Sequence, residues 1–136
     1  LQDILKKKIR LIDYEVIKNK RNIRLIGFGR YAGIVGCYNG FRTYGLKHGL
    51  FNLKPANQCA DRKEVERELK KVKLPNDFRL VLTGFGRVGH GAREITSLLP
   101  IREVKSDEYL NTSYDEPVFT HLEVEDYFEK SDGENL

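Results

Sequence analysis

The chain has 136 residues, of which 40% are hydrophobic and 32% charged. This length suits one compact domain, and the composition is typical of a globular protein rather than a disordered or fibrous one. No apolar run approaches the roughly 20 residues that a membrane span needs, and no signal-peptide pattern follows Leu1. Because the first residue is not Met, we expect a piece of a longer protein.

The net charge of +4 is unevenly distributed along the chain. Residues 103–136 hold 11 acids and two lysines, a net charge of −9, so the preceding residues carry +13. Clustered basic side chains are typical of nucleic-acid binding, because they neutralise phosphates. Here they are spread over several expected elements, so we expect solvated faces and no nucleic-acid partner.

The first part of the chain predicts a β-hairpin followed by a glycine-rich helix. The β-rich runs 9–17 and 23–28 are separated by the polar turn "KNKRN", which favours an antiparallel hairpin. From Tyr31 to His48 the apolar residues recur at helical spacing, with four glycines among them. Glycine costs roughly 1 kcal/mol inside a helix, so we expect this helix to lie close to another backbone.

The second part of the chain alternates helices and strands. Asp61 is expected to cap a helix over "RKEVERELKKVKL", and a strand is expected from Phe78 to Gly84. A helix from Arg87 to about Leu99, a strand at "IREVKS", a polar turn-rich stretch and a strand at "VFTHL" follow. This order predicts an α/β fold with parallel strands.

One glycine motif in this part has the context of a dinucleotide-binding turn. Residues 84–89 read G-F-G-R-V-G, between an expected strand and an expected helix. In such a turn Gly84 permits the sharp bend, Gly86 allows a pyrophosphate to approach the backbone, and Gly89 lets the helix pack on the strand. The free N–H groups of Arg87, Val88 and Gly89 would then face the phosphates.

An acidic residue that binds the ribose is expected about 20 residues further on, at the end of the second strand. Glu103, Asp107 and Glu108 all lie near that distance, and Lys105 beside them would suit a 2′-phosphate. The choice between NAD and NADP therefore stays open, with NAD as the first expectation.

The same four letters, GFGR, also occur at residues 27–30. There the third position after Gly29 is Ala32, and the expected strand belongs to a hairpin rather than to a βαβ unit. We therefore interpret this first copy as a packing and hinge motif. Cys37 and Cys59 form no disulfide or zinc pattern, so we expect a reducing cytoplasm, no metal, and a core position for Cys37.

The order "LIDYE", "GFGRYAGIVG" and "GFGRVGHGA" resembles the central region of lysine-forming saccharopine dehydrogenase and its alanine dehydrogenase and transhydrogenase relatives. The resemblance implies a Rossmann-like three-layer fragment with an N-terminal hairpin and a glycine-rich connecting helix. Residues 1–60 would form the interdomain part, and residues 61–136 the first part of the dinucleotide-binding domain. It also implies a cofactor site at Gly84, Gly86, Arg87, Val88 and Gly89.

The implied function is the cofactor-binding portion of a nicotinamide-dependent amino-acid dehydrogenase, most similar to the saccharopine type. The family's catalytic residues belong to a segment ahead of Leu1, so none is assigned, and the isolated chain is expected to be inactive. The alternatives are an alanine dehydrogenase-like enzyme and a non-catalytic partner-binding module that keeps the glycine turn. We expect a small amino-acid or 2-oxo-acid substrate and no membrane partner, and the exposed edges of a partial sheet favour a homo-oligomer.

Overall fold

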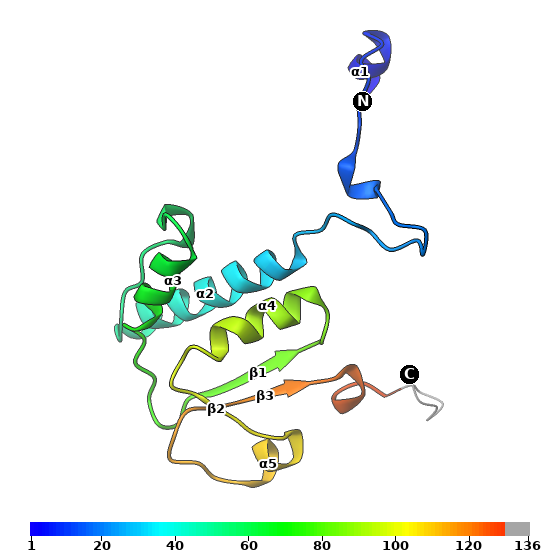
Figure 1. The fold of residues 1–136 in the computed structure, drawn as a ribbon. Coiled ribbons are helices and arrows are strands. Elements are labelled where there is room, and N and C mark those ends of the chain that lie inside the picture. The colour runs from blue at the N-terminus through cyan, green and yellow to red at the C-terminus, as the bar shows by residue number, and fades with distance from the viewer. Residues whose placement is uncertain (130–136) are drawn as a thin grey trace.

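A computed structural model describes residues 1–129 (Figure 1). It has an α/β body formed by residues 29–129 and an amino-terminal arm, residues 1–28, that runs away from this body. The helices are α1 (Gln2–Lys6), α2 (Gly29–His48), α3 (Arg62–Leu69), α4 (Arg87–Thr96) and α5 (Ser106–Asn111). Three short 3-10 turns are η1 (Tyr14–Val16), η2 (Ala56–Gln58) and η3 (Val124–Asp126). No helix within residues 1–129 is long and apolar enough to cross a membrane.

The described residues contain a three-stranded parallel sheet in the order β1-β3-β2. The strands are β1 (Arg79–Thr83), β2 (Arg102–Glu103) and β3 (Val118–Leu122). β3 lies in the middle, with Arg79 and Arg102 both opposite Val118. The expected α/β class with parallel strands is confirmed. In the usual dinucleotide-binding half the first strand pairs with the second, whereas here the third strand separates them.

Helices α2 and α4 lie side by side with their amino ends at the same end of the molecule (Figure 1). Their backbones touch at two glycines. A Cβ on Gly33 would overlap the carbonyl oxygen of Val88, and a Cβ on Gly91 would overlap that of Arg30. The expected close approach of the glycine-rich helix to another backbone is therefore confirmed at Gly33.

The other α2 glycines have different surroundings. Gly45 packs on the ring of Phe51, whereas Gly36 and Gly40 have no atom within 4 Å of the position that a Cβ would take. These last two glycines line an apolar hollow described below.

One hydrophobic core joins α2, α3 and α4. Tyr38 is completely buried, and its hydroxyl donates a hydrogen bond to the carbonyl oxygen of Lys54 at 2.6 Å. The buried core residues are Ile34, Tyr38, Phe41, Leu53, Leu69, Val72, Ile95 and Leu99. Because α2 shares this core with the later helices, a boundary between residues 60 and 61 would run through a packed unit. That boundary stays a prediction, and residues 130–136 of the second unit lie outside the described residues.

Ion pairs at Glu94 connect the same three helices. The Glu94 carboxylate accepts two hydrogen bonds from the Arg30 guanidinium, one of them at 2.8 Å, and one from Arg62 at 2.7 Å. Arg62 is the first residue of α3, which begins as expected at the cap Asp61, whose side chain accepts from the Glu64 N–H at 2.8 Å. Hydrogen bonds from Arg30 and then Arg62 hold the pKa of Glu94 at about 2.

The prediction of an amino-terminal hairpin with two full strands is wrong. A single antiparallel bridge joins Lys18 and Arg24, and Asn19 closes the turn between them by accepting from the Ile23 N–H at 3.0 Å. A two-stranded hairpin is marginal in water unless its apolar face is covered. All of residues 9–25 are exposed, so no described part of the chain covers the apolar side chains of these two runs. These side chains include Leu11, Ile12, Val16, Ile23 and Leu25.

Two further stretches differ from expectation. The second strand has only two residues, and the polar stretch after it contains the short helix α5 rather than turns alone. Helix α5 begins at Ser106, with Asp107 and Glu108 in its first turn. Acidic side chains at this position stabilise a helix, because they interact with the positive end of its dipole.

We predict opposite effects for the same substitution at two glycines of α2. Gly33→Ala forces the helices apart and should lower the free energy of unfolding by about 1–3 kcal/mol or more. Gly36→Ala meets open space inside a helix and should raise it by up to about 1 kcal/mol. Urea unfolding of both variants measures the difference. Equal effects would contradict the backbone contact at Gly33.

We also predict an acid-sensitive contribution from Glu94. Its pKa in the folded chain lies below the ordinary value, so its ion pairs stabilise fully above about pH 4.5 and weaken as the pH falls toward about 2. The unfolding free energy should therefore decrease more steeply over this range in the wild type than in Glu94→Gln. Glu125→Gln, which removes an exposed acid, should keep the wild-type slope, and an identical slope in Glu94→Gln would count against this ion-pair cluster.

Candidate dinucleotide site

The glycine turn of residues 84–89 joins β1 to α4. Gly84 has φ +83°, in the left-handed region that favours glycine, and its N–H donates to the Leu122 carbonyl oxygen at 3.0 Å. Pairing of β1 with β3 thus continues into the turn. A Cβ on Gly89 would overlap the carbonyl oxygen of Gly84, so only glycine allows the helix to start this close to the strand.

Gly86 differs from the other two glycines of the motif. It precedes α4 with φ −74°, a value any residue adopts, and no atom lies within 4 Å of the position of a Cβ. The open space over Gly86 is a place where a ligand can contact the backbone. The sharp turn at Gly84 and the close packing at Gly89 are thus seen, while the role of Gly86 toward a ligand stays a prediction.

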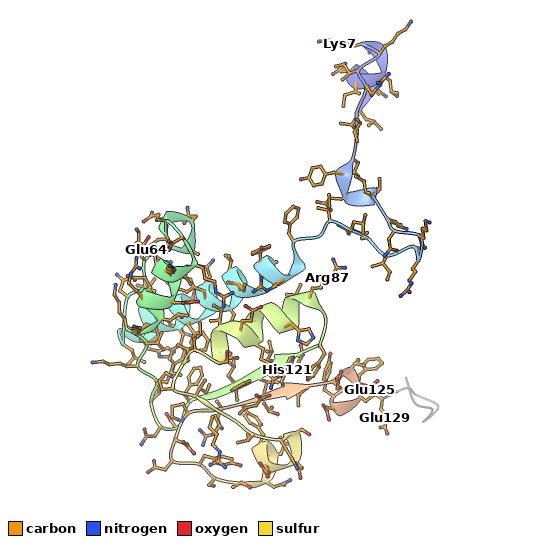
Figure 2. All side chains as sticks on the ribbon, in the orientation of Figure 1. Lys7, Glu64, Arg87, His121, Glu125 and Glu129 are labelled. Atoms are coloured by element: carbon orange, nitrogen blue, oxygen red, sulfur yellow. The ribbon has the colours of Figure 1, made fainter. Side chains whose placement is uncertain are left out.

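The amino end of α4 offers free hydrogen-bond donors. The first intrahelical bond joins the His90 N–H to the Gly86 carbonyl oxygen at 2.9 Å, so the N–H groups of Arg87, Val88 and Gly89 precede the helical ladder. No side chain caps this end and no acid lies in its first turn. Arg87 begins the helix beside the loop that leads into α2 (Figure 2). Free N–H groups at a positive helix end are suited to a phosphate.

His121 supports the turn and was not expected from the sequence. It lies in β3 below the start of α4 (Figure 2), and its Nε2 lies 2.8 Å from the Gly84 carbonyl oxygen. Since a carbonyl oxygen only accepts, Nε2 must be the donor. The imidazole also stacks on Phe85, with ring centres 3.7 Å apart and planes 9° apart. His121 therefore holds the turn through both the Gly84 carbonyl group and the Phe85 side chain.

The sequence signal for this role is weak. A histidine near the end of a strand gives no indication of its partner until the strand order is known. Once β3 is known to pair directly with β1, the residue opposite Leu82 is placed next to the glycine turn. Among residues 1–129, the Nδ1 of His121 is buried without a hydrogen-bond partner.

A hollow of about 640 Å³ lies where the chain leaves β2 and β3. Its lining residues are Glu103, Val104, Lys105, Ser106, Asp107, Glu108, Thr120 and His121. The three acids expected near a ribose therefore line one hollow, together with Lys105. His121 connects this hollow to the glycine turn, since it lines the former and is hydrogen-bonded to the latter.

A second hollow, of about 700 Å³, runs along β1 between α2 and α4. Apolar residues and the open glycines Gly36 and Gly40 line most of it. Cys37 is also part of this lining, and burial raises the pKa of its thiol to about 11, which disfavours a reactive thiolate. This hollow has the character of a packing surface rather than of a chemical site.

The residues at the glycine turn and the first hollow fit a bound dinucleotide. The turn supplies uncapped N–H groups, open space over Gly86 and the adjacent Arg87 for a pyrophosphate. The hollow supplies carboxylates for ribose hydroxyls at the carboxyl ends of parallel strands, where ligands of open α/β sheets bind. Binding at Gly84, Gly86, Arg87, Val88 and Gly89 remains a prediction.

Comparison with known proteins shows homology to a segment of alpha-aminoadipic semialdehyde synthases. The chain is 32% identical to "Alpha-aminoadipic semialdehyde synthase, mitochondrial" of Bos taurus over 132 residues, which covers 83% of the chain and 14% of the bovine protein. The protein of the same name from Mus musculus is 30% identical over the same shares, and "Alpha-aminoadipic semialdehyde synthase" of Arabidopsis thaliana is 31% identical over 74% of the chain and 11% of the plant protein. No family model matches the chain.

The chain therefore spans about 14% of the length of the mammalian relatives. Its homology to a segment of these synthases confirms the resemblance found in the sequence. The mammalian relatives are named as mitochondrial, so the cytoplasmic location expected from the sequence stays a prediction.

We predict that the hydrogen bond from His121 stabilises the glycine turn separately from the aromatic stack. His121→Phe keeps a ring against Phe85 but loses the donor to Gly84, and should lower the free energy of unfolding by about 1 kcal/mol. Hydrogen exchange of the turn amides should become faster. His90→Phe serves as the control, because it alters an exposed ring that is nearly perpendicular to Phe85, with ring centres 6.3 Å apart. Unchanged exchange in His121→Phe would remove the role assigned to Nε2.

Proposed function

We propose, from its homology to a segment of the alpha-aminoadipic semialdehyde synthases, that this chain is the cofactor-binding portion of a nicotinamide-dependent amino-acid dehydrogenase of the lysine-forming saccharopine dehydrogenase type. The observation that supports this most directly is the geometry of the turn between β1 and α4. Gly84 has a left-handed backbone, Gly89 packs against the Gly84 carbonyl oxygen, and Gly86 leaves open space for a ligand. The proposed cofactor is a nicotinamide dinucleotide, with NAD as the first candidate and NADP as the second.

Each part of the site has a separate task in this proposal. The N–H groups of Arg87, Val88 and Gly89 bind the pyrophosphate, and the guanidinium of Arg87 adds positive charge beside it. The hollow beyond β2 and β3 holds the adenosine end. His121 fixes the Gly84 carbonyl and the Phe85 ring, so the turn is preorganised and loses little freedom on binding.

The bound nicotinamide supplies hydride transfer, which for the saccharopine type acts on the imine formed between lysine and 2-oxoglutarate. Hydride transfer requires cofactor and substrate at near-attack distance. In this proposal the residues named above bind and orient the cofactor. No catalytic residue is assigned here.

We predict that Gly86→Val abolishes dinucleotide binding while the chain still folds. The backbone angles at Gly86 suit any residue and a Cβ there meets open space, so the variant should unfold at the same urea concentration as the wild type. The added side chain occupies the place of the pyrophosphate, and affinity should fall at least about a hundredfold. Calorimetric titration of the natural full-length protein with NAD⁺ and NADP⁺ measures this.

Gly40→Ala is the matched control, because Gly40 also has open space but lies on α2, away from the turn. It should bind as the wild type does. Wild-type protein that binds neither dinucleotide would overturn the proposal and favour a partner-binding module. Turnover of pyruvate with ammonia, and none with lysine and 2-oxoglutarate, would replace the saccharopine type by the alanine dehydrogenase type.

A further inference from the structure

The two arginines of the repeated letters GFGR have different partners. The Arg30 guanidinium donates two hydrogen bonds to the Glu94 carboxylate. Arg87 is exposed and forms no salt bridge within residues 1–129. It begins α4, whose amino end is the positive end of the helix dipole and has no acid in its first turn. A cation at this place gains stability when an anion binds beside it.

The backbone that leads into α2 lies along the Arg87 side chain (Figure 2). A Cβ on Gly29 would lie 3.0 Å from the Cβ of Arg87, and a Cβ on Gly27 would lie 2.7 Å from its Nη1. The first contact is at the base of the side chain and the second is at its guanidinium. The first turn of α2 contains no acid either, so no carboxylate in the first turn of either helix holds the guanidinium. The backbone of the loop therefore limits where the guanidinium can lie.

The backbone conformation of residue 27 does not itself require glycine. Gly27 is not among the described residues with positive φ, so other residues can adopt its conformation. A Cβ there would meet the end of a long, flexible side chain, which can rotate away. At Gly33 and Gly89 a Cβ would instead meet a backbone carbonyl oxygen, which cannot move without the fold. A side chain at residue 27 would therefore displace the Arg87 guanidinium and leave the fold intact.

We propose that Gly27 positions the Arg87 guanidinium for the pyrophosphate of a dinucleotide. Gly27 is a positioning residue that acts through Arg87. It keeps the guanidinium beside the amino end of α4, so that charge-assisted hydrogen bonds from the guanidinium and from the helix N–H groups can reach one anion. The first copy of GFGR thus takes part in the site that the second copy forms. The inference rests on the proposed function, since it assumes that a dinucleotide binds at this turn.

The test is calorimetric titration of the natural full-length protein with NAD⁺ and NADP⁺, in the wild type, Gly27→Ala, Arg87→Ala and the double variant. For the dinucleotide that the wild type binds more tightly, Gly27→Ala should weaken binding about tenfold, the effect of losing one hydrogen bond to a charged group. Arg87→Ala should weaken it at least as much. The double variant should bind no more weakly than Arg87→Ala, because Gly27 then has no guanidinium to position. Gly27→Ala should unfold at the same urea concentration as the wild type.

The control is Gly40→Ala, which also adds one methyl group at a glycine but meets open space on α2. It should bind as the wild type does. Unchanged binding in Gly27→Ala or in Arg87→Ala would overturn the inference and leave the cofactor function standing. The same holds for a double variant whose affinity falls by the product of the two single effects, and for a lower urea midpoint in Gly27→Ala, which would assign this glycine to packing. Binding of neither dinucleotide by the wild type would remove the proposed function itself.

Discussion

The contact between the backbones of α2 and α4 determines the arrangement of the rest of the body. Two glycines, one on each helix, allow a carbonyl of the partner helix to approach where a side chain would otherwise stand. Around this contact the large residues of α2 reach the core shared with α3 and α4, and the Arg30 guanidinium reaches Glu94. The α4 start, with its donors, is thereby held at a fixed place above the sheet.

The same contact explains why four letters occur twice in the chain. Both copies of GFGR end at the first turn of a helix, and these two helices start next to each other. A Cβ on Gly29 would lie 3.0 Å from the Cβ of Arg87, so the first copy leaves room for the second. The packing part of the interpretation of residues 27–30 agrees with this geometry, and the hinge part stays a prediction. Its copy at residues 84–87 adds the left-handed Gly84 and the open Gly86.

Charge is arranged along the molecule in a way that suits a polar, elongated ligand. Uncapped helix N–H groups and Arg87 lie at the glycine turn, while carboxylates gather where β2 and β3 end. Arg87 and the carboxylates of Glu103, Asp107 and Glu108 thus lie at the same end of the parallel sheet. A dinucleotide has a charged middle and hydroxyl-bearing ribose groups, so the proposed site would offer it donors and positive charge at the turn and acceptors at the hollow.

Much of the body could be predicted from the sequence because local signals and tertiary structure agree there. Asp61 caps its helix, the strand before Gly84 is short and apolar, and the glycines of α2 indicated a close contact. The arm could not be predicted in this way, since its β-rich runs need a covering surface that residues 1–129 lack. His121 was missed because its role depends on strand order, which no local pattern contains.

The central position of β3 has a consequence for how the chain folds. β1 and β2 come first in the sequence but share no hydrogen bonds, so neither has a sheet partner until residues 118–122 are placed between them. The sheet then forms in one late step over long sequence separations, which slows folding. The His121 contact to Gly84 is made in that same step, so a chain interrupted before β3 would lack an ordered glycine turn as well as a sheet.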